Sequence, residues 1–72
     1  MKRTFKLSEL DCANCAAKME TAINKLDTVD SATINFMSQR LTLEAADDKF
    51  EEAVELAQKA INKVERDCRI VR

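Results

Sequence analysis

The residues with the clearest chemistry in this chain of 72 amino acids are its cysteines. Cys12 and Cys15 form a C-x-x-C pair, Asp11 directly precedes the first of them, and Cys68 stands alone near the carboxyl end. Two thiolates at this spacing reach one thiophilic ion from a single loop. We therefore take Cys12 and Cys15 as candidate metal ligands.

Asp11 bears on which ion the pair prefers. Cu(I) is satisfied by two thiolates, whereas a divalent ion requires about four ligands and accepts carboxylate oxygen. A carboxylate beside Cys12 therefore favours Zn²⁺ or Cd²⁺ over Cu(I). The alternative is that Asp11 is the N-cap of the following helix, because Asp is a preferred capping residue. We favour metal contact, since the helix is expected to begin a few residues later.

Cys68 has two interpretations. It alternates with Ile70 on an apolar strand, and cysteine is among the residue types most often buried, so it fits a core position. The last strand should also lie antiparallel to the first, close to the end from which the C-x-x-C loop leaves. Cys68 is therefore also a candidate third sulfur, or a close neighbour of the site without direct ligation.

Composition excludes several classes of protein. A hydrophobic fraction of 46% is too high for a disordered tail, and the apolar stretches are too short to cross a membrane. The first residues lack the apolar stretch of a secretory signal. Positive and negative charges are interspersed and the net charge is −1, so no basic stripe for nucleic acid is present. We expect one cytoplasmic domain covering residues 1–72, without membrane insertion and monomeric without metal.

The apolar periodicity predicts six elements in the order strand, helix, strand, strand, helix, strand. The strands are expected at residues 3–7, 32–36, 40–44 and 68–71, and the first helix at residues 14–26. Asp47 or Asp48 is expected to cap the second helix, whose apolar stripe runs from Phe50 to Val64. This order predicts an α+β fold, the ferredoxin-like βαββαβ sandwich with a four-stranded antiparallel sheet and two helices on one face.

The predicted helix should affect the ionisation of the two thiols of the pair. Cys15 should lie in its first turn and Cys12 on the loop before it. The amino-terminal end of a helix carries a partial positive charge that lowers the pKa of a nearby thiol. The position therefore favours thiolate ligation at neutral pH.

The segment from Leu10 to Glu20 resembles the loop and first helix of the heavy-metal-associated domains. Residues 32–36 and 40–43 are similar to the central hairpin of that family. In the family, Asp before the first cysteine is typical of the amino-terminal domains of Zn²⁺-, Cd²⁺- and Pb²⁺-exporting P-type ATPases, whereas copper members more often carry Thr, Ser or His. The resemblance therefore implies Zn²⁺, Cd²⁺ or Pb²⁺ as cargo, with Cu⁺ less favoured.

One departure concerns the two residues before Asp11, where the family usually has Gly-Met. Here Glu9 and Leu10 occupy those places. We expect Leu10 to take the apolar role of Met, and Glu9 to make the loop stiffer and more acidic because it cannot copy a flexible glycine.

The resemblance implies a regulatory or delivery domain on the cytosolic face of a metal-exporting ATPase. Its partner would be the membrane-transporter portion of that ATPase or a metallochaperone, and the ion would pass by stepwise exchange of ligands. We expect no catalysis by the domain itself, because the chain has no His and no phosphate-binding loop. Two alternatives stay open: a stand-alone metallochaperone, including one for Cu(I), and a dithiol redox protein. The redox alternative lacks the proline that thioredoxin-like folds place beside their disulfide.

Overall fold

The predicted order of strands and helices is confirmed by the computed structural model of the chain, which describes residues 1–71. Residue 72 of the expected domain lies outside the described residues. A short 3₁₀ helix, η1, precedes the second α-helix. The elements are β1 (Lys2–Ser8), α1 (Ala13–Asn24), β2 (Ser31–Asn35), β3 (Arg40–Glu44), η1 (Asp47–Lys49), α2 (Phe50–Val64) and β4 (Arg69–Val71).

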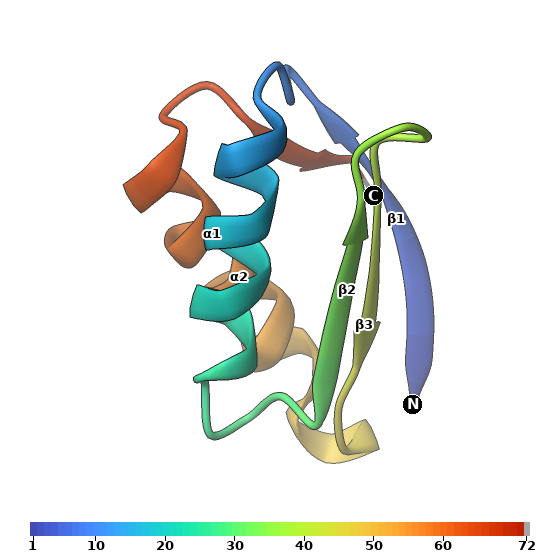
Figure 1. Cartoon of the computed structure of the whole chain (residues 1–72). Coiled ribbons are helices and arrows are strands. Elements are labelled where there is room, and N and C mark those ends of the chain that lie inside the picture. Colours follow the sequence, from blue (N-terminus) through green and yellow to red (C-terminus); the bar gives the residue numbers. More distant parts are fainter. Residues whose placement is uncertain (72) are drawn as a thin grey trace.

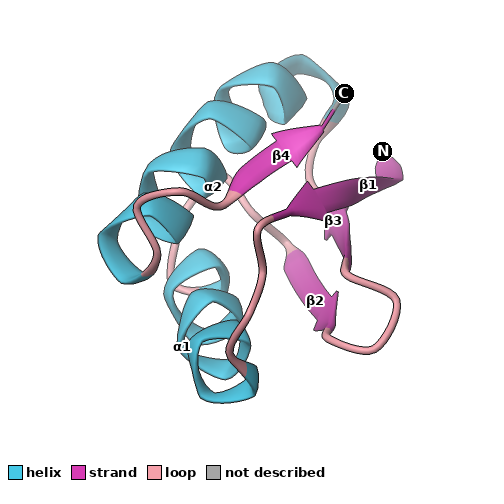
Figure 2. Ribbon diagram, turned by 90° about the horizontal axis from the view of Figure 1, so that it is seen from above, coloured by secondary structure: helices cyan, strands magenta, loops and turns pink. Residues whose placement is uncertain are grey.

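The four strands form one antiparallel sheet in the order β2-β3-β1-β4. Phe5 lies opposite Leu41, and Leu7 lies opposite Ile70, so apolar side chains meet on the same face of neighbouring strands. Both helices cover that face (Figures 1 and 2). The fold is therefore the predicted ferredoxin-like sandwich.

A single apolar core lies between the sheet and the helices. The rings of Phe5 and Phe50 stack with their centroids 6.2 Å apart, which joins β1 to the start of α2. The largest fully buried side chains come from both layers and the adjoining loops: Leu7, Leu10, Met19, Ile23, Leu41, Leu43, Phe50, Ile61 and Cys68. Burial of these side chains supplies the main favourable term in folding.

Side chains of α1 hydrogen-bond the outer edge of β2. Asn24 Oδ1 accepts a hydrogen bond of 2.9 Å from the Ala32 N–H, and Asn24 Nδ2 donates one of 2.8 Å to the Ala32 carbonyl. One turn earlier, Glu20 Oε2 accepts the N–H of Ile34 at 2.8 Å. Unpaired groups on an edge strand are a template for pairing with another chain. These bonds therefore hold α1 on the sheet and occupy the β2 edge.

The β4 edge is bonded to α2 in the same way. Gln58 Oε1 accepts the N–H of Ile70 at 2.8 Å, and Gln58 Nε2 donates to the carbonyl of Cys68 at 3.0 Å. Asn62, one turn later, also donates to the Cys68 carbonyl at 3.0 Å. Each helix therefore uses two polar residues four positions apart to hold one edge strand.

The predicted cap of the second helix is wrong. Ala46 is the N-cap of η1 and Lys49 is the N-cap of α2, and neither makes a side-chain capping hydrogen bond. Asp47 and Asp48 lie inside the first turn of η1 instead. Their negative charges still stabilise that end, because they complement the partial positive charge of the helix.

We expect Asn24→Ala to lower the free energy of unfolding by about 1 to 2 kcal/mol, because two backbone groups of Ala32 lose their partner. Urea unfolding followed by circular dichroism measures this. Asn14→Ala is the matched control, since Asn14 is exposed on the same helix. Equal unfolding midpoints for the two variants would show that the contacts with β2 contribute nothing.

Candidate metal centre

Residues 9–12 form the loop that joins β1 to α1, here named the metal loop. This loop ends at the N-cap of α1. That N-cap is Cys12, with extended backbone angles of φ −131° and ψ 120°. Its Sγ accepts a hydrogen bond of 3.2 Å from the N–H of Cys15, and its carbonyl accepts one of 3.0 Å from the N–H of Ala16. Both thiols are free and half-buried. The C-x-x-C pair is therefore fixed on the end of the helix.

Asp11 is not the N-cap, because Cys12 occupies that position. The capping alternative for Asp11 is therefore wrong. Its side chain is exposed between the fully buried Leu10 and the half-buried Cys12. Within residues 1–71, it forms no hydrogen bond or ion pair. The carboxylate, on the residue directly before the N-cap cysteine, is accordingly open to solvent.

Leu10 and Glu9 fix the start of the metal loop. Leu10 has no exposed surface, so its predicted apolar role is confirmed. Glu9 has φ 62°, which is the left-handed region that glycine adopts most readily. The expectation that Glu9 could not copy glycine is wrong for the backbone, although the conformation costs a non-glycine residue about 1 kcal/mol.

The two thiols of the pair ionise differently. The hydrogen bond from the Cys15 thiol lowers the pKa of Cys12, and the bond from the Cys15 N–H lowers it further. The same thiol–thiol hydrogen bond raises the pKa of Cys15, and burial and the negative charge of Cys12 act in the same direction. The predicted lowering at the helix end therefore falls on Cys12, which is the first of the pair to become a thiolate.

Cys68 lies directly before β4, at the same end of the sheet as the metal loop. The β1–β4 register pairs Ser8 with Arg69, which places Cys68 next to the point where the chain leaves β1. Its side chain is completely buried, and burial is the main cause that raises its pKa. The core position predicted for Cys68 is confirmed, and its ligation of metal stays a prediction.

The structure brings Cys12 and Cys15 together without a third ligand. In the part of the chain that it describes, no group of three or more Cys, Asp and Glu side chains is placed to hold an ion. A divalent ion would therefore have to draw Asp11, or another side chain at this end, towards the pair. Figure 1 shows the metal loop, the β2–β3 turn and the segment before β4 at one end of the sheet.

Glu65 is a residue of this region that the sequence analysis missed. It is the half-buried C-cap of α2, and its negative charge raises the pKa of Cys12, Cys15 and Cys68 alike. Its position shortly before the last strand could have pointed to it. Because the first and last strands are antiparallel, the start of the last strand lies at the same end of the sheet as the end of the first strand. A carboxylate shortly before the last strand is therefore near the C-x-x-C loop.

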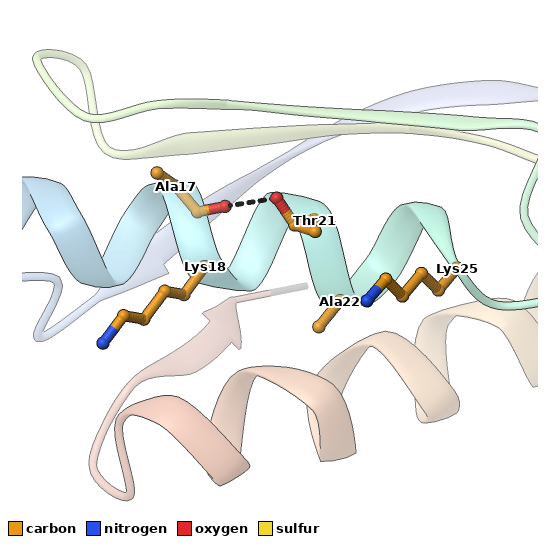
Figure 3. A pocket seen from close by; sticks show the side chains of 5 residues that line it. All are labelled: Ala17, Lys18, Thr21, Ala22 and Lys25. Atoms are coloured by element: carbon orange, nitrogen blue, oxygen red, sulfur yellow. Dashed lines mark hydrogen bonds between the residues drawn. The ribbon is translucent and has the colours of Figure 1, made fainter.

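An open pocket on the surface of α1 lies apart from this site (Figure 3). Its lining residues are Ala17, Lys18, Thr21, Ala22 and Lys25. The Thr21 hydroxyl donates a hydrogen bond of 3.0 Å to the carbonyl of Ala17. No thiol or carboxylate lines the pocket, so it offers a soft metal no ligand.

Comparison with known proteins agrees with the fold. The model of the heavy-metal-associated domain family matches residues 4–66. The chain therefore belongs to this family of metal-binding domains.

Two curated relatives are transporters. The chain is 35% identical over 66 residues to a cadmium, zinc and cobalt-transporting ATPase of Bacillus subtilis, which covers 92% of the chain and 8% of the relative. It is 42% identical over 43 residues to the ATPase of the same description in Helicobacter pylori, covering 60% of the chain and 6% of the relative. The chain thus spans less than a tenth of either transporter. No helix in residues 1–71 is long and apolar enough to span a membrane.

The solved structure of the CopZ metallochaperone has the same fold. The two superpose with a TM-score of 0.75 over 99% of this chain and 100% of the other, at 24% sequence identity. This likeness establishes the fold and leaves the identity of the ion open.

We expect iodoacetamide to modify Cys12 before Cys15 in the reduced, metal-free protein at neutral pH, because the thiolate is the nucleophile. Cys68 should react last, since it is buried. The difference in modification rate between Cys12 and Cys15 should become smaller as the pH rises, because both thiols then ionise. Mass spectrometry of the digested protein measures the three rates.

Cys12→Ala is the informative variant. It removes the hydrogen bond that raises the pKa of Cys15, so Cys15 should then react faster at neutral pH. Equal rates at Cys12 and Cys15 in the unmodified protein would contradict the assigned order of ionisation.

Proposed function

We propose that the domain binds one divalent soft ion, Zn²⁺ or Cd²⁺ with Pb²⁺ as a further candidate, through Cys12, Cys15 and Asp11. The exposed carboxylate of Asp11, on the residue directly before the N-cap cysteine, is the observation that carries this proposal. Cys12 captures the ion first because it is the more acidic thiol. Cys15 follows on losing its proton, and the Asp11 carboxylate supplies the oxygen that a divalent ion accepts.

The ion is cargo rather than a structural part of the domain. The two relatives described above are cadmium, zinc and cobalt-transporting ATPases, which supports a role as the regulatory or delivery domain of such an exporter on its cytosolic face. In that role the thiols release the ion one ligand at a time to the transporter portion. The half-buried, helix-bound thiols suit this exchange, because a partner reaches them without unfolding of the core.

A stand-alone metallochaperone is the second candidate function. It is supported by the CopZ metallochaperone, whose whole length superposes on this chain. This candidate includes Cu(I) as cargo, since the thiol pair alone satisfies an ion of low coordination. The two candidates differ in the role that they give to Asp11, because Cu(I) needs no carboxylate.

Asp11→Ala is expected to weaken Cd²⁺ and Zn²⁺ binding by roughly tenfold, about 1.4 kcal/mol, and to leave Cu(I) affinity unchanged or slightly improved. The reason is that a divalent ion loses an oxygen ligand, whereas bis-thiolate Cu(I) loses only an unneeded negative charge. Competition titrations of the reduced protein with the three ions measure this, and cadmium–thiolate absorption in the ultraviolet reports the Cd²⁺ complex.

Asp11→Asn is the matched control, because it keeps a weaker oxygen and removes the charge. Neither variant should change thermal stability, since Asp11 does not cap α1. An unchanged ratio of Cd²⁺ to Cu(I) affinity in both variants would show that Asp11 is not a ligand of the ion. Absence of the cadmium–thiolate band in the unmodified protein would reject metal binding by the pair and favour the redox alternative.

We further propose that Cys68 supports the site from the core without binding the ion. Cys68→Ala should lower stability by about 1 kcal/mol, because a buried sulfur is lost. It should leave the cadmium–thiolate band and the Cd²⁺ affinity unchanged, whereas Cys15→Ser should abolish both. A weaker band in Cys68→Ala would instead identify Cys68 as a third sulfur ligand.

A further inference from the structure

Gln39, the last residue of the β2–β3 turn, joins that turn to the metal loop on both sides of Glu9. Its main-chain carbonyl accepts a hydrogen bond of 2.8 Å from the N–H of Leu7, which extends the β1–β3 ladder by one residue. Its side-chain Nε2 donates a hydrogen bond of 2.7 Å to the carbonyl of Leu10. The side chain is half-buried. One residue of the hairpin therefore holds the chain before and after the bend at Glu9.

The two residues at this contact have unusual backbones. Glu9 has φ 62° and Gln39 has φ 54°, and within residues 1–71 no other non-glycine residue has a positive φ. Such conformations persist where the surrounding structure determines them, and they gather at binding sites. Here the two hydrogen bonds and the buried Leu10 side chain together hold the bend.

The contact fixes the orientation of the peptide that joins Leu10 to Asp11. The Leu10 side chain lies in the core, its carbonyl is bonded to Gln39, and Cys12 is bonded to the end of α1. Only Asp11 between them is exposed. Without the Gln39 amide, the peptide before Asp11 would lose this constraint, and more chain entropy would be lost when the carboxylate is drawn to an ion on the thiol pair.

We propose that Gln39 is a positioning residue that fixes the peptide before Asp11, so that a divalent ion bound by Cys12 and Cys15 can draw in the Asp11 carboxylate at little cost in chain entropy. This inference rests on the proposed function, because it assigns Gln39 a part in the same site. It predicts that loss of the Gln39 side-chain amide lowers the affinity for divalent ions and leaves the affinity for Cu(I) unchanged. A merely structural role for Gln39 predicts instead a loss of stability without a change in metal preference.

Gln39→Gly separates the two roles. Glycine keeps the main-chain carbonyl that bonds Leu7 and removes only the side-chain bond to Leu10. It also relieves the left-handed backbone at this position, which offsets the loss of the hydrogen bond to Leu10, so stability should change little. Met37→Gly is the matched control, since Met37 lies in the same turn and the residue is 90% exposed.

The experiment measures Cd²⁺ and Cu(I) affinities by competition, the urea unfolding midpoint, and backbone order parameters of the metal-free protein. For Gln39→Gly we expect Cd²⁺ affinity to fall by roughly threefold to tenfold, Cu(I) affinity to stay the same, and the order parameter of Asp11 to fall. Glu9→Gly, which keeps the Gln39 amide, should retain the order of Asp11.

Unchanged Cd²⁺ affinity in Gln39→Gly, with normal binding by the unmodified protein, would overturn the positioning role alone. An equal loss of Cd²⁺ and Cu(I) affinity would also overturn it, because the thiols would then be the groups affected. Failure of the unmodified protein to bind Cd²⁺ would overturn the proposed function itself.

Discussion

The hydrogen bond from the Cys15 N–H to the Cys12 sulfur is the interaction on which the site depends. It uses a backbone donor that every helix leaves without an intrahelical partner, so the thiol pair is held by the helix end itself. A second hydrogen bond, from the Cys15 thiol to the Cys12 sulfur, makes the two cysteines unequal, because the proton shared between the thiols stays on Cys15. A helix start thus provides both the geometry and the order of ionisation.

The position of that helix end is determined by the rest of the fold. α1 is tied to β2 through Glu20 and Asn24, and α2 is tied to β4 through Gln58 and Asn62. Both helices therefore stay in register with the sheet without using metal ligands. The proposed role, in which the domain accepts and releases an ion, requires such a scaffold, since a fold built on the ion would be lost on every release.

The sequence predicted those features that depend on local periodicity. Alternation in the strands and the helical stripes identified the elements, and C-x-x-C identified the thiol pair. The cap of α1 was missed because cysteine is not among the preferred capping residues, whereas the neighbouring Asp11 is. Glu65 and Gln39 were missed because their importance depends on which loops meet at one end of the sheet, and no local pattern reports that.

The net charge of the thiol pair with its ion differs between a divalent ion and Cu(I). Two thiolates with a divalent ion form a neutral group, and Asp11 then adds one negative charge beside the positive end of α1. With Cu(I) the same ligands carry one more negative charge, close to Glu65, whose charge already raises the pKa of both thiols. Accumulated negative charge at a half-buried site is unfavourable, since like charges repel and burial removes solvation. The acidic residues at this end of the sheet therefore support the proposed preference for a divalent ion.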